Sequence, residues 1–126
     1  MIVKGKNVVY RLDGKLYHCP MDITMKYIGG KWKAVVLWYL KGGTLRFAEL
    51  KKRIPAITEK MLSIQLHTLE ADGLIERKVY GSKPPVRVEY SLTEFGKTLI
   101  ETLNAISKWG RNLGANRGEL VELQEK

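Results

Sequence analysis

The sequence is poor in cysteine and histidine, and it has no long apolar run. It holds one cysteine, Cys19, and two histidines, so an intrachain disulfide is excluded and few soft metal ligands are available. The longest apolar run, residues 34–40, is far shorter than the roughly 20 residues that cross a membrane as a helix. No early stretch has the pattern of a signal peptide. These absences predict a cytoplasmic protein with no metal site and no membrane association.

The residues that enzyme chemistry needs are also missing. The segment GGKW, residues 29–32, looks like part of a phosphate-binding loop. That motif requires glycine five residues before its Gly-Lys pair and Ser or Thr after it, but Met25 and Trp32 occupy those places. No nucleophile, base and orienting acid can be assembled around the adjacent His18 and Cys19. We therefore expect a protein that is not an enzyme and that uses no cofactor.

Positive charge is abundant, and most of its excess lies in the middle of the chain. The formal net charge is +9 at neutral pH. Residues 26–97 contain fourteen Lys and Arg but only seven Asp and Glu, whereas residues 98–126 contain four of each kind. Phosphate is a natural partner for such a surface, although basic proteins without a specific ligand are common. The length of 126 residues, 44% of them apolar, fits one domain.

The first part of the chain predicts a hairpin followed by a short helix. Asp13 and Gly14 form a dipeptide favoured in two-residue turns, and β-forming residues flank it, so we expect a β-hairpin within an N-terminal extension, residues 1–18. Pro20 is tolerated in the first turn of a helix, and Gly29 is suited to its end.

The next segments predict two further helices. Residues 32–40 are apolar almost all round, which is typical of a core helix. The residues that recur on one stripe are Trp32, Val35, Val36, Tyr39 and Leu40. A short extended piece and a helix over about residues 47–53 follow, and Pro55 ends that helix because it disfavours the helical conformation at Ile54.

A helix with two different faces comes next, beginning after Thr58, which suits the N-cap, and ending at Gly73, which suits a left-handed C-terminal position. At 100° per residue, one stripe of leucines should pack against the core: Leu62, Leu66 and Leu69. The opposite side, which we call the reading face, consists of Lys60, Ser63, Ile64 and His67 and is flanked by Met61 and Gln65. This face lacks acids and carries groups that both donate and accept hydrogen bonds, so it indicates a polar target.

Two strand-like runs, residues 74–80 and 86–92, surround a Gly- and Pro-rich tip, GSKPP. Two helices separated by a short turn and followed by such a ribbon form a winged helix-turn-helix. We therefore predict a mainly α (α+β) fold with a wing of two to three strands.

The C-terminal part predicts one long amphipathic helix from Thr93, a suitable cap, to Leu113. Its apolar stripe consists of Phe95, Leu99, Leu103, Ile106 and Leu113, widened by Ile100 and Trp109. Because other helices already supply a core, we expect this stripe to bury against a second subunit, although packing within one chain would give the same periodicity. The winged-helix domain with its dimerisation helices then spans residues 19–113. Residues 114–126 form a tail, with a linker, GANRG, before a short helix.

Several segments together resemble one family of proteins. They are IGGKW at residues 28–32, RF with EL at 46–50, EADGL at 70–74 and VEYSLT at 88–93. In order and spacing they are similar to the HxlR family of bacterial winged-helix transcriptional regulators, relatives of the MarR group, over residues 19–109. The resemblance implies a homodimeric DNA-binding regulator whose first helix and long C-terminal helix make dimer contacts. It implies no particular operator, effector or direction of regulation.

The physics of DNA recognition agrees with this resemblance. The major groove of B-DNA, about 12 Å wide, admits an α-helix, and we expect the reading face to enter it with Met61 beside it. Free N–H groups near Thr58 suit a phosphate. Other cations are expected on the DNA backbone or, for the wing, in the minor groove, unless they are simply solvated: Arg46 with Lys51 or Lys52, and Lys83 with Arg87.

Three alternatives remain open. In some members of the family that the chain resembles, a cysteine before proline at this position senses oxidants or electrophiles, so Cys19 is either a redox sensor or a half-buried packing thiol. A small-molecule effector could bind between the DNA-binding domain and the dimer helices. The aromatic residues available to line such a pocket are Tyr27, Trp32, Trp38 and Trp109. A winged helix used for protein or RNA contact is the third alternative, which the polar reading face does not favour.

Overall fold

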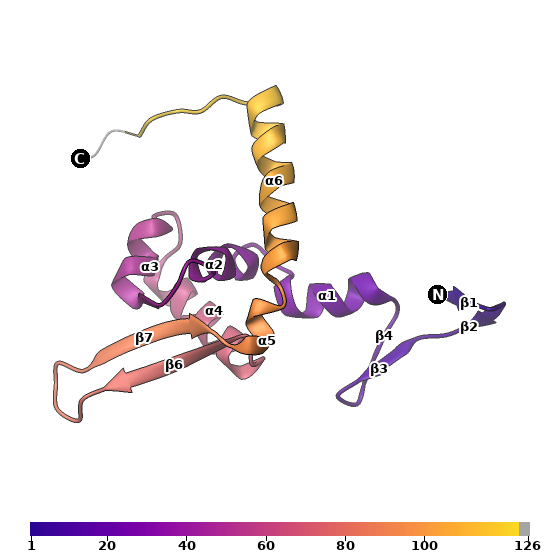
Figure 1. Ribbon diagram of the computed structural model, residues 1–126, viewed down its shortest axis with the longest axis horizontal. Coiled ribbons are helices and arrows are strands. Elements are labelled where there is room, and N and C mark those ends of the chain that lie inside the picture. Colours follow the sequence, from indigo (N-terminus) through magenta and orange to yellow (C-terminus); the bar gives the residue numbers. More distant parts are fainter. Residues whose placement is uncertain (124–126) are drawn as a thin grey trace.

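The computed structural model describes residues 1–123, which form small antiparallel sheets and six helices. Helices α2 to α5 and the sheet of the wing form the body, α1 and the N-terminal arm extend to one side, and α6 rises away from the body (Figure 1). The elements are β1 (Ile2–Val3), β2 (Lys6–Asn7), β3 (Tyr10–Leu12), β4 (Lys15–Tyr17), α1 (Pro20–Ile28), α2 (Lys33–Leu40), β5 (Leu45–Arg46), α3 (Phe47–Arg53), α4 (Glu59–Ala71), β6 (Ile75–Tyr80), β7 (Arg87–Leu92), α5 (Glu94–Lys97) and α6 (Ile100–Arg117). None of the described helices is long and apolar enough to cross a membrane.

The N-terminal arm contains two hairpins where the sequence predicts one. The predicted turn at Asp13 and Gly14 is confirmed, with φ of 49° and 77°, and it joins β3 to β4. A second turn of the same kind, at Lys4 and Gly5 with φ of 51° and 77°, joins β1 to β2. Two successive positive φ angles are what a two-residue type I′ turn requires. The first hairpin was missed because lysine is not among the residues that usually begin such a turn.

Helix α2 is central, as its composition predicts, but the buried stripe is shifted from the expected one. Val36, Leu37 and Leu40 are buried in the core, whereas Val35 and Tyr39 are only half-buried. The helix is apolar almost all round, so periodicity alone does not decide which side meets the core. Val35 and Tyr39 instead help to line a groove between α2 and α6.

Helices α3 and α4 form the predicted helix-turn-helix. The N–H of Met61 donates a hydrogen bond of 3.0 Å to the Oγ1 of Thr58, which confirms the predicted N-cap of α4. Gly73 has a φ of 77°, so it follows the end of the helix in the expected left-handed conformation. The predicted stripe of leucines is completely buried and consists of Leu62, Leu66 and Leu69. This packing leaves the opposite side of α4 free.

The wing is part of a three-stranded antiparallel sheet in the order β5-β7-β6, which agrees with the predicted two to three strands. Its inner end is tied to the corner after α4. The hydroxyl of Thr93 donates a hydrogen bond of 2.6 Å to the backbone oxygen of Gly73 and accepts one of 3.0 Å from the N–H of Gly96. A Cβ at Gly96 would overlap the carbonyl oxygen of Leu74, so this close approach requires glycine.

The C-terminal helix differs from the predicted one at both ends. Thr93 caps the short helix α5, and a turn at Thr98 and Leu99 separates α5 from α6. The close contact of Gly96 with the backbone of Leu74, just before β6, fixes the direction of α5. Helix α6 then continues to Arg117, so the predicted linker at residues 114–118 is wrong for residues 114–117, and only Gly118 lies outside the helix. Gly114 costs only about 1 kcal/mol in a helix, and the residues around it are compatible with one.

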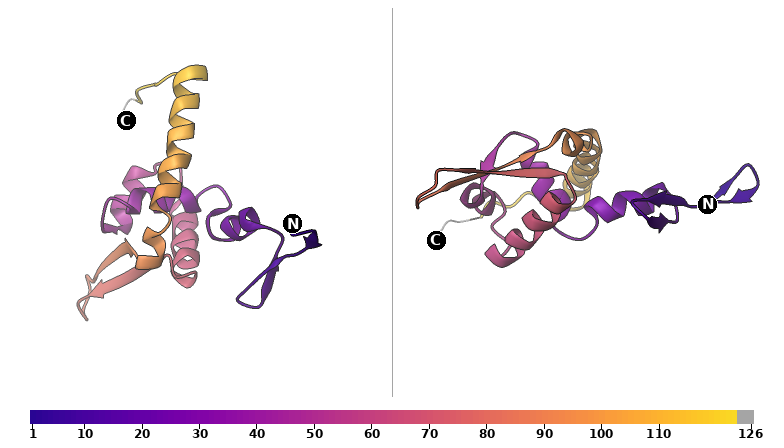
Figure 2. Two further views of the ribbon diagram at one scale, coloured as in Figure 1. Left: turned by 45° about the vertical axis from the view of Figure 1, so that its right-hand side comes forward. Right: turned by 90° about the horizontal axis from the view of Figure 1, so that it is seen from below.

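The predicted helix in the tail is also wrong for residues 119–123, which have no regular secondary structure. Residues 124–126 of that predicted helix lie outside the described part of the chain. The left view of Figure 2 shows that most of α6 stands clear of the body. Leu103 is the one fully buried residue that α6 contributes to the core.

Candidate nucleic-acid interface

The structure gathers the whole reading face on one side of α4. Lys60, Ser63 and His67 are exposed, and the apolar Ile64 between them is 46% exposed. Within residues 1–123, the side chains of Lys60, Ser63 and His67 take part in no ion pair or hydrogen bond. Their donors and acceptors are therefore available to an external ligand.

The residues that flank the reading face are more constrained. Met61 and Gln65 are half-buried, and the side-chain amide of Gln65 donates a hydrogen bond of 3.2 Å to the sulfur of Met61. Met61 also packs against the core, so the structure places it at the border of the predicted site. At the start of the helix, the Thr58 hydroxyl is engaged in the cap, and Glu59 brings a carboxylate into the first turn. That charge opposes the phosphate contact expected at Thr58.

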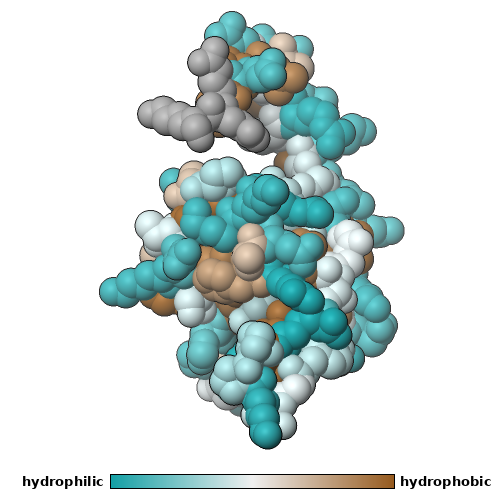
Figure 3. Space-filling model, turned by 90° about the vertical axis from the view of Figure 1, so that its left-hand side faces the viewer, coloured by the Kyte–Doolittle hydropathy of each residue, from teal (hydrophilic) through white to brown (hydrophobic). Residues whose placement is uncertain are grey.

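The lysines predicted to contact DNA from α3 and from the wing tip differ in whether the protein already engages their side chains. The ammonium of Lys51 donates a hydrogen bond of 3.1 Å to the carbonyl oxygen of Pro55, so it stabilises the turn between α3 and α4. Lys52 is exposed beside it, and Lys83 is exposed at the tip of the wing. Figure 3 shows the side of the molecule on which α3 and the wing tip lie, and hydrophilic residues cover most of it.

The strand register assigns the wing residues to two faces. Partners in an antiparallel pair have side chains on the same side of the sheet. Arg77 pairs with Tyr90, and both line a hollow with α4, so we call their side the helix-side face. Lys78 pairs with Glu89 and therefore lies on the other side, which we call the far face.

The two arginines predicted from the sequence to contact DNA both belong to the far face. Arg46 is the β5 partner of Glu89, and Arg87 is the β7 partner of Tyr80. The Nε of Arg87 lies 3.2 Å from a carboxylate oxygen of Glu89, and its guanidinium carbon lies 4.6 Å from the centre of the Tyr80 ring. Arg87 is thus engaged by its own sheet, and neither arginine is on the side of α4.

A polar hollow lies between α4 and the helix-side face of the wing. It is lined by Ser63, Leu66, His67 and Glu70 of α4, with Arg77 and Tyr90 of the sheet. Arg77 is not among the contact residues predicted from the sequence. The alternation along β6 separates Arg77 from Lys78, but only the pairing of Arg77 with Tyr90 shows which of the two shares a face with α4.

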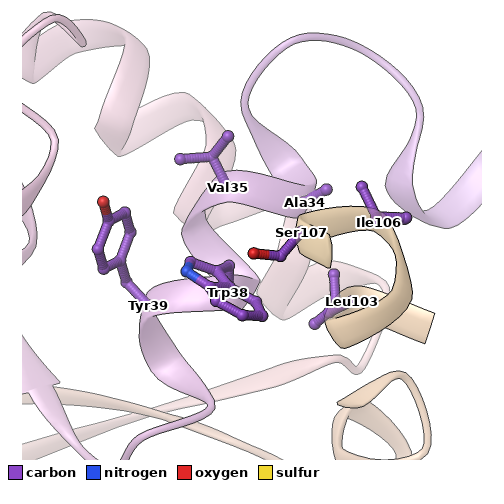
Figure 4. Close-up of a pocket in the computed structure, with 7 residues that line it drawn as sticks. All are labelled: Ala34, Val35, Trp38, Tyr39, Leu103, Ile106 and Ser107. Carbon is purple, nitrogen blue, oxygen red and sulfur yellow. The ribbon is translucent and has the colours of Figure 1, made fainter. Parts of the chain in front are cut away.

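An apolar groove lies between α2 and α6 on another part of the molecule (Figure 4). Its lining consists of Ala34, Val35, Trp38 and Tyr39 of α2 with Leu103, Ile106 and Ser107 of α6, and in this view Trp38 lies nearer to α6 than Tyr39 does.

The aromatic residues that the sequence suggested for an effector pocket do not share one cavity among residues 1–123. Trp38 lines the α2–α6 groove. Tyr27 makes an edge-to-face contact with Phe95, with ring centres 5.5 Å apart and an angle of 82° between the rings. Trp109 lies further along α6 and is 70% exposed, and Trp32 packs beside the core. The proposed set of pocket residues is therefore wrong for one subunit, because α6 carries Trp109 away from the body.

Cys19 occupies the N-cap position of α1, in extended backbone, and is half-buried. Its side chain makes no capping hydrogen bond. Nowhere in the described chain do three or more His, Cys, Asp or Glu side chains come together as a metal site.

Comparison with known proteins gives a consistent result. A family model described as HxlR-like helix-turn-helix matches residues 27–117. An HTH-type transcriptional regulator of Methanothermobacter thermautotrophicus is 50% identical over 101 residues, which are 80% of this chain and 76% of that protein. The HTH-type transcriptional regulator YybR of Bacillus subtilis is 43% identical over 107 residues, 85% of this chain and 82% of the relative. The structure of the redox regulator HypR in its oxidised form is similar with a TM-score of 0.72 and 44% identity, over 80% of this chain and all of that chain.

Proposed function

The chain belongs to the HxlR-like helix-turn-helix family, and we propose that it regulates transcription as a homodimer that binds a specific, roughly palindromic DNA site in the cytoplasm. The observation that carries this proposal is the state of α4. One side of the helix is locked into the core by three buried leucines, while the reading face is exposed and its polar side chains make no hydrogen bond or ion pair within residues 1–123. The role is one of binding, and it requires no catalysis.

The reading face supplies the chemistry that base recognition needs. The ammonium of Lys60 can donate to O6 or N7 of guanine, and Ser63 and His67 can meet either a donor or an acceptor on a base edge. The exposed Ile64 can contact the methyl group of thymine. These residues follow one another along the side of α4 that would lie in the major groove.

Phosphate contacts would complete the interface. We propose that Lys52 and Lys83, which are exposed, and the N-terminus of α4 near Thr58 touch the backbone. Arg46 and Arg87 remain candidates for backbone contact from the far face, with Arg87 partly neutralised by Glu89. Met61, which is half-buried, would form one edge of the reading face.

Dimerisation would use α6. Ile106 and Trp109 are 47% and 70% exposed, and with Leu103 and Leu113 they recur at helical spacing on the same side of α6. That apolar stripe is continuous with the α2–α6 groove through Ile106. A monomer would leave it in water, whereas a two-fold partner would bury it. Two reading helices related by that axis would lie about 34 to 36 Å apart, or a multiple of this, along DNA.

A selection experiment tests the proposed function. The protein is used to enrich duplexes from a random library, and the enriched duplex is compared with a scrambled duplex of the same composition over a salt series. We expect tight binding to the enriched duplex, with affinity that falls steeply as salt rises. Failure to enrich any sequence, together with equal and weak binding to both duplexes, would contradict the proposal and favour a protein or RNA partner.

A second candidate function is control of DNA binding by oxidants or electrophiles through Cys19. The similar protein HypR is described as a redox regulator. Cys19 is the only cysteine of this chain, so a disulfide would have to join it to another molecule. Cys19 is half-buried at the N-cap of α1, and α1 would take part in the dimer contact.

A further inference from the structure

Arg77 has no role among the DNA contacts proposed above. Its side chain is exposed on the helix-side face of the wing, opposite Tyr90 in the strand register. The ion pairs within residues 1–123 involve other cations, namely Lys26, Lys78, Arg87 and Lys97. Arg77 therefore has no acidic partner in the part of the chain that the structure describes, and its charge is available.

The surroundings of Arg77 consist mainly of hydrogen-bond donors. It shares a hollow with Ser63 and His67 of α4 and with Tyr90 of β7. Serine and tyrosine hydroxyls and an imidazole N–H can each donate to an anionic oxygen, and a guanidinium can give two parallel hydrogen bonds to phosphate. Glu70 also lines the hollow and would repel an anion, but it lies beyond His67 toward the C-terminal end of α4 and forms no ion pair with Arg77.

The position of the hollow relates it to DNA. Ser63 and His67 belong to both the reading face and the lining of the hollow. When a helix lies in the major groove, the sugar-phosphate backbones border it on both sides, and side chains at the edges of the helix reach them. The sugar-phosphate backbone on the wing side of the groove would run past this hollow.

We infer that the hollow between α4 and the wing is a binding site for one backbone phosphate of the DNA, with the Arg77 guanidinium as its main ligand and Ser63 and Tyr90 as supporting donors. This inference rests on the proposed DNA-binding function and adds to it a contact on β6 that fixes the wing relative to the reading helix. It also predicts that the two faces of β6 differ in function, since Arg77 would touch DNA and the neighbouring Lys78 would not.

The test compares Arg77→Gln with Lys78→Gln, two exposed cations that are adjacent in the same strand but lie on opposite faces. Each variant is titrated against the duplex enriched by the wild-type protein and against its scrambled version, over a salt series. Arg77→Gln should lower affinity for both duplexes by a similar factor and reduce the slope of log affinity against log salt by about 0.9, the value for one phosphate contact. Lys78→Gln should leave the slope unchanged, and Arg77→Lys should retain it. Thermal unfolding controls for the fold.

The outcomes separate the inference from the proposed function. If the wild-type protein binds the enriched duplex and Arg77→Gln matches it in slope and affinity, or if Lys78→Gln reduces the slope equally, the phosphate site is refuted while the regulator remains. A loss restricted to the enriched duplex, with the slope unchanged, would make Arg77 a base contact and overturn the assignment. If the wild-type protein binds no duplex, both proposals fail together.

Discussion

The ammonium of Lys26, in α1, lies 2.8 Å from the carboxylate oxygen Oδ1 of Asp72, the residue that ends α4. The pair joins two segments that are 46 residues apart in the sequence. Both side chains are partly shielded from water, and the Lys26 ammonium also lies 4.4 Å from the centre of the Tyr27 ring. The helix α4, which carries the reading face, is thereby connected to α1, which carries Cys19 at its start.

Asp72→Asn should lower the free energy of unfolding by at most about 1 kcal/mol, the upper range for a partly exposed ion pair. The hydrogen bond that Lys26 donates to Asp72, together with the negative charge of Asp72, raises the pKa of Lys26 above its ordinary 10.5. The stabilisation of the folded state by charged Lys26 is therefore fully present below pH 10.5, and it is lost as pH rises through the higher pKa that Lys26 has in the folded protein. Urea denaturation should show a difference between the variant and the wild type at neutral pH that shrinks above pH 10.5. Glu94→Gln, which breaks an exposed pair with Lys97, is the control and should change little. Equal stability of Asp72→Asn and wild type at neutral pH would contradict this role.

Thr58→Ala should destabilise the protein by about 1 kcal/mol, because it removes the acceptor for the N–H of Met61 in the first turn of α4. Thr58→Ser keeps a hydroxyl and should retain most of that stability. Thr68 is in the same helix, and its hydroxyl only donates back to the carbonyl of Ile64, so Thr68→Ala is a matched control with a smaller expected effect. Urea denaturation measures all three, and a Thr58→Ala curve that overlays the wild type would show that the cap contributes nothing.

Trp109→Asp should convert the proposed dimer to a monomer, because it places a charge in the middle of the apolar stripe of α6. Asn104 is exposed on the other side of the same helix, so Asn104→Asp introduces the same charge and should leave the dimer intact. Sedimentation equilibrium gives the mass of each species. A wild-type protein that sediments as a monomer, or a dimer that survives Trp109→Asp, would remove this stripe from the interface.

Oxidation should weaken DNA binding if Cys19 is a sensor. Diamide treatment of the wild-type protein should lower its affinity for the enriched duplex, and Cys19→Ser should be insensitive because the chain has no other thiol. Mass spectrometry of the same samples establishes whether the thiol has reacted. Unchanged affinity in a sample whose Cys19 is fully modified would show that the thiol only packs.

Features that depend on neighbouring residues could be predicted from the sequence, and features that depend on distant contacts could not. The cap at Thr58, the turn at Gly73 and the exposure of Lys60 follow from the local order of residues in α4. The break between α5 and α6 depends on the contact between Gly96 and the backbone of Leu74, which no helical periodicity contains.

The wing shows the same limit within the candidate site. Alternation along a strand predicts that Arg77 and Lys78 point to opposite sides, but it does not say which side meets α4. That assignment needs the register with Tyr90 and the packing of β6 against α4. For this reason the sequence pointed to Arg87, near the loop, and passed over Arg77.

The central claim is that the reading face of α4 recognises DNA sequence. The most direct measurement is competition between the enriched and scrambled duplexes for a variant in which Lys60, Ser63 and His67 are all changed to Ala. These side chains are exposed, so the variant should keep its helical content and thermal stability. We predict that the preference for the enriched duplex falls to near unity while weak, salt-dependent binding to both duplexes remains. A folded variant that retains the wild-type preference would contradict the account, because sequence would then be read by another surface.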